Sequence, residues 1–255
     1  MVRLLEDKVA IVTGAAQGIG RAIAETMAEH GAHVVVADLQ VHQARTVASA
    51  IEAATDRQAL ALALDVSDKS SVEALLEAAV AQFDRVDILV NNAAILLPSL
   101  VVDMPEADWE RTFAVNAKGV FLCSQAVARQ MIAQGDGGAI INIASCAGKK
   151  ADSRHAAYSS SKAAVMAFTR VLALEVGAHN IRVNGINPGA TDTQMLRGVC
   201  AAVPGLFEQL KGRTVLGRIA QPQDQANVAV FLASDMAAHI TGETLVVSGG
   251  EMMSQ

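Results

Sequence analysis

Short apolar runs alternate with longer segments of helical periodicity along most of the chain. Runs rich in Val, Ile, Leu and Ala predict strands over residues 8–13, 33–38, 59–64, 86–91, 139–145, 181–187 and 243–248. The segments between them predict helices over 18–30, 40–54, 69–82, most of 106–134, 156–178 and 223–233. Residues 190–220 are polar and irregular, and neither a repeat nor a linker divides the chain. We therefore expect a single domain over residues 1–255.

The strand-like runs are continuous rather than alternating, which is typical of strands buried on both faces. Repeated β-α-β connections then predict an α/β fold: a doubly wound parallel sheet of about seven strands with helices on both faces. Ligands of such sheets bind beyond the carboxyl ends of the strands. The loops after residues 13, 38, 64, 91, 145 and 187 are therefore the expected site.

The composition excludes several classes of protein. Of the 255 residues 52% are hydrophobic and 18% charged, which argues against disorder and allows a large core. A net charge of −6, 3% aromatics and no basic run give no support for nucleic-acid binding. No apolar run approaches the roughly 18 residues of a membrane span. The N-terminus does not read as a signal peptide. The three cysteines lack the spacing of a disulfide framework or zinc site, so we expect no metal and a cytoplasmic location.

A glycine-rich stretch, TGAAQGIG at residues 13–20, follows the first strand and opens the first helix. Glycines allow a tight turn and a close approach of the backbone to a pyrophosphate, and the helix start supplies free N–H groups. An ordinary glycine-rich turn would show the same spacing, but the flanking strand and helix favour a dinucleotide site. The expected cofactor contacts in this loop are Gly14, Gln17, Gly18, Ile19 and Gly20.

Acidic residues end the second and third strands. A carboxylate at Asp38 would accept hydrogen bonds from the adenine ribose and would repel a 2′-phosphate. No Arg or Lys stands at 15–17 or 39, so the sequence favours NAD over NADP. Leu39, Asp65 and Val66 are further candidate cofactor contacts. Asp38 could instead be a helix cap or a solvated loop acid, and Asp65 could cap the next helix.

The sequence YSSSK at 158–162 places a tyrosine and a lysine on one face of a predicted helix. A nearby ammonium favours the tyrosinate, so the phenol of Tyr158 could act as an acid or base. Tyr158 is the only tyrosine of the chain. By itself this spacing is more often a tyrosine at the edge of the core beside a solvated lysine.

Several motifs follow one another in a fixed order. They are the glycine-rich loop, the NNAA stretch at 91–94, Asn116, Ser145, the Tyr158/Lys162 pair and the Pro188-Gly189 pair. Together they closely resemble the short-chain dehydrogenase/reductase family, from about residue 6 to residue 250. The resemblance implies a single Rossmann-like domain, NAD as cofactor, an alcohol or ketone substrate, a homotetramer and a Ser-Tyr-Lys-Asn catalytic set.

By this resemblance, Tyr158 is the general base in oxidation and the acid in reduction, and Ser145 holds the substrate oxygen. Lys162 binds the nicotinamide ribose and lowers the pKa of Tyr158. Asn116 holds a water of a proton relay, and Asn91 supports the cofactor and the central strand. The remaining cofactor contacts that the resemblance implies are Ala93, Pro188, Gly189, Thr191 and Thr193.

Two positions depart from the family pattern. Ala94 replaces a glycine and narrows the space near the nicotinamide, and Ser248 replaces an aspartate near the C-terminus, which puts local packing or assembly in doubt. We expect the substrate pocket to include Ser145, Leu97, Ala147, His155 and Met195, although His155 could be a solvated loop residue. Residues 190–220 are expected to form a mobile substrate lid; a statically packed helical excursion is the alternative.

The NNAA stretch and residues 131–142 are similar to bacterial polyol dehydrogenases of the sorbitol type. The leading hypothesis is therefore an NAD-dependent oxidoreductase that acts on a sugar alcohol or small polyol. A 3-oxoacyl-type carbonyl reductase and a non-catalytic NAD-binding regulatory protein are the alternatives.

Overall fold

The computed structural model describes residues 3–150 and 152–253. Seven strands form one sheet in the order β3-β2-β1-β4-β5-β6-β7, and every neighbouring pair is parallel. They are β1 (Val9–Thr13), β2 (His33–Asp38), β3 (Ala59–Ala63), β4 (Ile88–Asn91), β5 (Gly138–Ile143), β6 (Ile181–Pro188) and β7 (Thr244–Val247). The predicted doubly wound sheet is confirmed. Its strand order reverses between β1 and β4, where ligands of such sheets bind.

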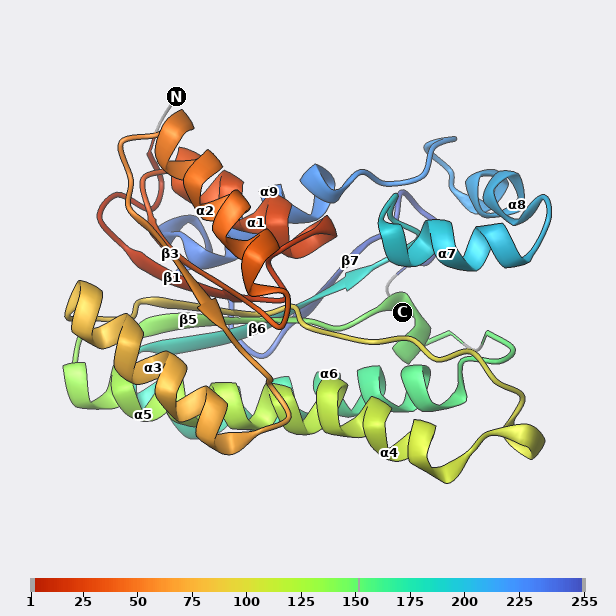
Figure 1. The fold of residues 1–255 in the computed structure, drawn as a ribbon, viewed down its shortest axis with the longest axis horizontal. Coiled ribbons are helices and arrows are strands. Elements are labelled where there is room, and N and C mark those ends of the chain that lie inside the picture. The colour runs from red at the N-terminus through yellow and green to blue at the C-terminus, as the bar shows by residue number, and fades with distance from the viewer. Residues whose placement is uncertain (1–2, 151, 254–255) are drawn as a thin grey trace.

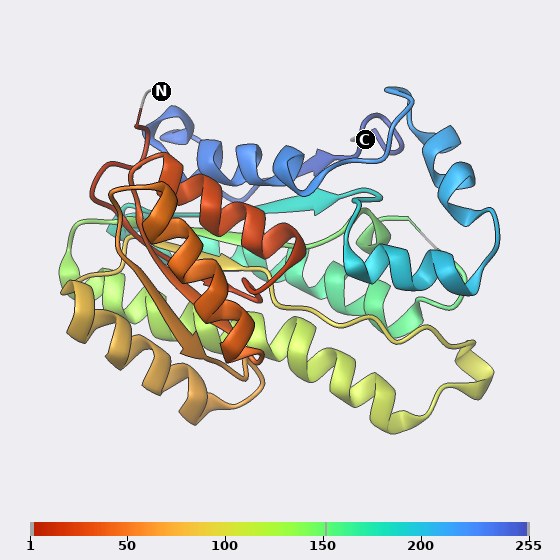
Figure 2. The ribbon, with the colours of Figure 1, turned by 45° about the horizontal axis from the view of Figure 1, so that its top comes forward.

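Helices cover both faces of the sheet (Figure 1). On one face lie α1 (Gly18–Glu29), α2 (Val41–Ala54) and α9 (Pro222–Ala233). On the other lie α3 (Lys69–Phe83), α4 (Glu106–Phe113), α5 (Gly119–Gln134) and α6 (Ala156–Val176). Two more helices, α7 (Gln194–Ala202) and α8 (Leu206–Arg213), extend from one end of the sheet (Figure 2). Among the described residues, no helix combines the length and apolar character needed to cross a membrane.

The core lies in two layers, one on each face of the sheet. Successive residues of a strand point to opposite faces, so Val12 of β1 joins the layer under α1 while Ile11 joins the layer under α3 and α5. Both side chains are completely buried, which explains the continuous apolar run. The two edge strands differ from the expectation of full burial: β3 and β7 are only partly buried, because each has a neighbouring strand on one side alone.

Two segments differ from the predicted elements. The helix expected over most of 106–134 is divided by a π-helical turn, Ala114–Lys118, between α4 and α5. Residues 190–220, expected to be irregular, contain α7 and α8. Neither of these two helices has a fully buried residue, so neither packs into the core of the domain.

Candidate active site

The loop between β1 and α1 is shaped by two glycines with positive φ, Gly14 at 63° and Gly18 at 57°. A Cβ on Gly14 would stand 2.8 Å from the Cα of Ala93, so only glycine allows this close approach of the first and fourth strand loops. Asn92 fixes the approach, because its amide donates to the carbonyls of Thr13 at 3.0 Å and Gly14 at 2.9 Å.

The first turn of α1 begins at Gln17, whose exposed side chain makes no capping hydrogen bond. The N-cap side chain therefore satisfies none of the N–H groups at the start of this helix, and Ile19 and Gly20 belong to that first turn. Thr193 lies beside the same loop, because a Cβ on Gly18 would be 3.4 Å from the Thr193 methyl group. This geometry suits a ligand phosphate.

Asp38 lies at the end of β2, beside this loop, and is 8% exposed. One carboxylate oxygen accepts from the backbone N–H of Ala16 at 3.0 Å and the other from that of Gln40 at 2.9 Å. Asp38 is thus neither a solvated loop acid nor the N-cap of α2, which is Gln40. Each oxygen keeps a lone pair for a ligand hydroxyl, and Leu39 beside it is 71% exposed.

The side chain of Asp65 accepts hydrogen bonds from within its own loop. One carboxylate oxygen accepts from both the backbone N–H and the hydroxyl of Ser67, at 2.9 and 2.7 Å. It does not cap α3, whose N-cap is Asp68. Val66 is buried against Gly119, where a Cβ would lie 2.7 Å from the valine methyl group. The structure therefore places these two candidates at the third strand's end with mainly local contacts.

Tyr158 and Lys162 lie one turn apart near the start of α6. The amine of Lys162 lies 5.7 Å from the centroid of the Tyr158 ring and donates a 2.7 Å hydrogen bond to the carbonyl of Ile143. Lys162 is 2% exposed, and its burial lowers its pKa to about 8. The alternative of a solvated lysine is therefore wrong.

Ser145 follows β5 and faces Tyr158 from the neighbouring loop. Burial raises the pKa of Tyr158, while a hydrogen bond with Ser145 acts in the opposite direction. The Ser145 hydroxyl also accepts from the backbone N–H of Ala147 at 3.1 Å, which orients it. The expected lowering of the Tyr158 pKa by Lys162 is not found. The lysine lies over the ring and donates to a carbonyl, and the dominant effect on the phenol is its removal from water.

Asn116 lies completely buried in the π-helical turn. Its amide nitrogen donates to the carbonyl of Ile95 at 2.9 Å and to the hydroxyl of Ser161 at 3.1 Å, and its oxygen accepts from the N–H of Ile95 at 2.9 Å. Ser161 in turn donates to the carbonyl of Tyr158 at 2.7 Å. Asn116 thus joins the loop after β4 to the helix that carries Tyr158.

Asn91 belongs to a second buried polar chain. Its amide donates to the Ser124 hydroxyl at 2.9 Å and to the Asn142 oxygen at 2.8 Å, and Asn142 donates to Thr169 at 2.9 Å. This chain of hydrogen bonds ties β4 and β5 to α5 and α6. The oxygen of Asn91 has no partner within the described part of the chain.

The loop after β6 carries the remaining cofactor candidates. Pro188 ends the strand opposite Val247 of β7, and the N–H of Gly189 donates to the carbonyl of Val247 at 3.1 Å. Thr191 is buried and donates to the carbonyl of Gly189 at 3.1 Å, while Thr193 forms the N-cap of α7. This loop therefore extends from the sheet edge to the glycine-rich loop.

The substrate candidates lie around Tyr158 to different degrees. The ring of His155 stands edge-on to that of Tyr158, with 6.3 Å between centroids, so His155 lies beside the candidate acid–base residue. Leu97 on the loop after β4 and Ala147 on the loop after β5 are both half-buried, and Met195 on α7 is 42% exposed.

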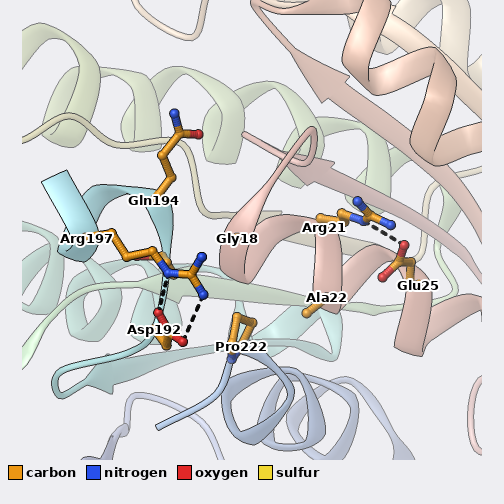
Figure 3. Close-up of a pocket in the computed structure, with 9 residues that line it drawn as sticks. Gly18, Arg21, Ala22, Glu25, Asp192, Gln194, Arg197 and Pro222 are labelled. Carbon is orange, nitrogen blue, oxygen red and sulfur yellow. Dashed lines mark hydrogen bonds and ion pairs between the residues drawn. The ribbon is translucent and has the colours of Figure 1, made fainter. Parts of the chain in front are cut away.

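A pocket of about 310 Å³ separates the start of α1 from the start of α7 (Figure 3). Arg21 pairs with Glu25 at 2.8 Å on the α1 side, and Arg197 pairs with Asp192 at 2.7 Å on the α7 side. Each of these ion pairs stays on its own side of the pocket. The segment with α7 is thus not held to α1 by either pair.

Three residues that organise the site were not foreseen: Asn92, Ser161 and Gln225. The completely buried amide of Gln225 on α9 donates to Thr191 at 3.3 Å and to the carbonyl of Val247 at 3.1 Å. The NNAA stretch signalled Asn92, but nothing local signalled Gln225, whose partners lie 34 and 22 positions away.

The sheet, the glycine-rich loop and the Ser145–Tyr158–Lys162 cluster define a dinucleotide-dependent oxidoreductase fold. A family model described as enoyl-(acyl carrier protein) reductase matches residues 14–251. An NAD-dependent glycerol dehydrogenase from Listeria innocua is 41% identical over 96% of this chain and 94% of its own length. A D-threitol dehydrogenase from Mycolicibacterium smegmatis is 42% identical over 96% and 93%.

Among solved structures, a 7α-hydroxysteroid dehydrogenase in complex with NADH and 7-oxo glycochenodeoxycholic acid superposes with a TM-score of 0.92. It is 41% identical and covers 96% of this chain and 94% of that one. The chain belongs to the short-chain dehydrogenase/reductase family and is an oxidoreductase.

The residues present fit NAD. The glycine-rich turn leads directly into the start of α1, where the N-cap residue Gln17 makes no side-chain hydrogen bond to the backbone N–H groups. Asp38 stands where a ribose would meet it, with a carboxylate that disfavours a 2′-phosphate. The residues of this chain that would hold NAD are those of the loops after β1, β2 and β6.

Proposed function

We propose that this chain is an NAD-dependent dehydrogenase of a sugar alcohol or small polyol, interconverting a secondary alcohol and its ketone. The observation that carries the chemistry is the cluster of Tyr158, Ser145 and Lys162 at the carboxyl ends of β5 and β6. The relatives named as glycerol and D-threitol dehydrogenases support the polyol class. Asp38 supports NAD over NADP.

Tyr158 takes the proton of the substrate hydroxyl during oxidation and returns it during reduction. Ser145 donates to the substrate oxygen and holds it beside the phenol. Bound NAD supplies the acceptor for the hydride that leaves the substrate carbon. Lys162, which the family resemblance places at the nicotinamide ribose, is protonated below its pKa of about 8.

Asn116 holds the helix of Tyr158 in register with the loop after β4. Both amide protons of Asn116 are engaged in hydrogen bonds, while its side-chain oxygen accepts one and keeps a second lone pair. We propose that the water of the proton relay donates to this lone pair. Asn91, with one unpartnered buried oxygen, supports the strand below the cofactor.

We assign the role of substrate lid to residues 190–220, within the single domain. Support comes from α7 and α8, which have no fully buried residue, and from the pocket between α7 and α1. Residues at the end of the segment are anchored, since Ile219 is 4% exposed. Loosely packed elements of this kind open at low free-energy cost.

We also propose a homotetramer in the cytoplasm. The outer faces of α5 and α6 expose Phe121 at 42%, Val171 at 52% and Leu174 at 86%. Apolar groups gathered in this way are typical of interfaces. The three cysteines are free, as in a reducing compartment. Light scattering that gives the mass of one chain at working concentration would contradict the tetramer.

An activity assay of the purified protein tests the proposal. The substrates are a panel of polyols, secondary alcohols and 3-hydroxyacyl esters, each with NAD and with NADP. We expect reduction of NAD with polyols, followed by the absorbance of the reduced nicotinamide. Preferred turnover of hydroxyacyl esters with NADP would identify the carbonyl reductase instead. NAD binding without turnover of any alcohol would favour a regulatory role.

A further inference from the structure

The C-terminal end of the described chain reaches both loops that carry the candidate site. Glu251 accepts from the amine of Lys150, in the loop after β5, at 3.0 Å. Its second carboxylate oxygen accepts from the backbone N–H of Ala190, in the loop after β6, at 3.4 Å. One carboxylate thus bridges the loop of Ser145 and the loop of Gly189.

The Glu251 side chain is 8% exposed, and that of Lys150 is 33% exposed. A carboxylate removed from water to this extent is costly unless charge and hydrogen bonds compensate. Lys150 supplies the charge, and the Ala190 N–H supplies a donor. The close fit extends to Gly189, where a Cβ would lie 3.1 Å from the same Glu251 oxygen.

The backbone around Glu251 is itself anchored at the site. Ser248 is 5% exposed, and its hydroxyl accepts from the N–H of Met252 at 3.1 Å. The N–H of Glu251 donates to the carbonyl of Ser248 at 3.2 Å, and the N–H of Leu216, at the end of the lid segment, donates to that of Gly249 at 3.1 Å. The carboxylate is therefore presented from a fixed turn rather than from a loose tail.

We propose that Glu251 is a positioning residue that holds the loop after β6 against the loop after β5 and so sets the wall of the site on the nicotinamide side. This inference rests on the proposed function and on the family resemblance, which implies that Gly189 and Thr191 contact NAD at its nicotinamide half. Glu251 touches neither the substrate nor the reacting atoms. Its loss displaces the loop after β6 and leaves the glycine-rich loop and Asp38 in place.

Titration calorimetry with NADH and with ADP distinguishes the nicotinamide half of the cofactor site from the half formed by the glycine-rich loop and Asp38. ADP carries the adenosine and phosphates but no nicotinamide. We expect Glu251→Ala to raise the Kd for NADH at least about five-fold and to leave the Kd for ADP within about two-fold. Glu251→Gln, which retains an acceptor for the Ala190 N–H but loses the ion pair, is expected to give a smaller increase.

The matched control is Glu73→Gln, which removes the exposed 3.5 Å pair of Glu73 with Lys69 on α3 and should change neither Kd. Equal weakening of NADH and ADP would show a general loss of structure and overturn the proposal. Unchanged NADH affinity in the folded Glu251→Ala and Glu251→Gln proteins would also overturn it. A wild-type protein that binds NADH but oxidises no polyol would refute the substrate class and leave this test intact. A wild-type protein that does not bind NADH would refute both.

Discussion

Lys162 lies over the face of the Tyr158 ring, with its amine 5.7 Å from the ring centroid. The two residues are one helical turn apart, so the local sequence brings them to the same side of α6. The burial that surrounds them is tertiary, and it lowers the pKa of Lys162 to about 8 while it raises that of Tyr158. The lysine therefore changes charge close to neutral pH.

Replacing Lys162 by Met should not reduce stability at pH 6.5. The unfolded amine has a pKa of 10.5 and the folded one about 8, so the folded state binds the proton less well. At about 1.4 kcal/mol per unit, the charged lysine costs the folded state roughly 3 kcal/mol below pH 8. Loss of the hydrogen bond to Ile143 offsets about 1 kcal/mol of the gain.

The sign of this effect predicts a pH dependence. Between pH 8 and pH 10.5 the folded lysine is neutral while the unfolded one is still protonated. The free-energy cost of burying Lys162 therefore falls as the pH rises through this range. Urea unfolding should show Lys162→Met about 2 kcal/mol more stable than the wild type at pH 6.5, with the advantage lost by pH 10. Lys69→Met, at an exposed position, is the control. A variant much less stable than the wild type at pH 6.5 would show that the buried amine stabilises the fold.

Tyr158→Phe should remove turnover and spare cofactor binding. The ring and its contact with His155 remain, whereas the proton acceptor is lost. General acid–base catalysis contributes about 100-fold to 10,000-fold, so we expect kcat to fall by at least about 100-fold. The Kd for NADH should stay within about two-fold. Turnover within a few-fold of the wild type would assign the acid–base role to another group.

The rate of alcohol oxidation should rise with pH from neutral into the alkaline range. Burial raises the pKa of Tyr158, so the phenolate that accepts the proton is a minor species at neutral pH and increases as the pH rises. The Ser145 hydrogen bond lowers this pKa, and Ser145→Ala should therefore move the profile further toward alkaline pH. Initial rates at saturating NAD measure both profiles. A shift toward acidic pH in the variant would contradict this arrangement.

Asp38→Asn should weaken NAD binding about ten-fold and narrow the preference for NAD over NADP. In the wild type, the two carboxylate oxygens accept hydrogen bonds from the backbone N–H groups of Ala16 and Gln40. In the variant, the side-chain NH2 group must replace one of these oxygens, so a donor then faces a donor. Loss of the charge also removes repulsion of a 2′-phosphate. Asp65→Asn is the matched control, since Asp65 bonds Ser67 in its own loop. An equal effect of both variants would remove the special role of Asp38.

Limited trypsin digestion should cleave first between residues 194 and 213, at Arg197, Lys211 or Arg213. This segment has no fully buried residue in either of its helices, so local opening costs little free energy. NADH should slow the cleavage if the segment closes over the cofactor. Mass spectrometry of the first fragments identifies the site. The same rate with and without NADH would favour a statically packed segment.

The sheet, the glycine-rich loop and the Tyr158–Lys162 pair could all be predicted from the amino-acid sequence. Each depends on local periodicity or on short spacing: apolar runs for strands, glycines between a strand and a helix, and residues one helical turn apart. The partial burial of β3 and β7, the helices within 190–220, and the contacts of Gln225 and Glu251 became visible in the folded structure alone. Those contacts join residues 34 and 61 positions apart, as between Thr191 and Gln225 and between Ala190 and Glu251. Tertiary burial likewise decided the direction of the Tyr158 pKa, because no local pattern records how far a side chain is removed from water.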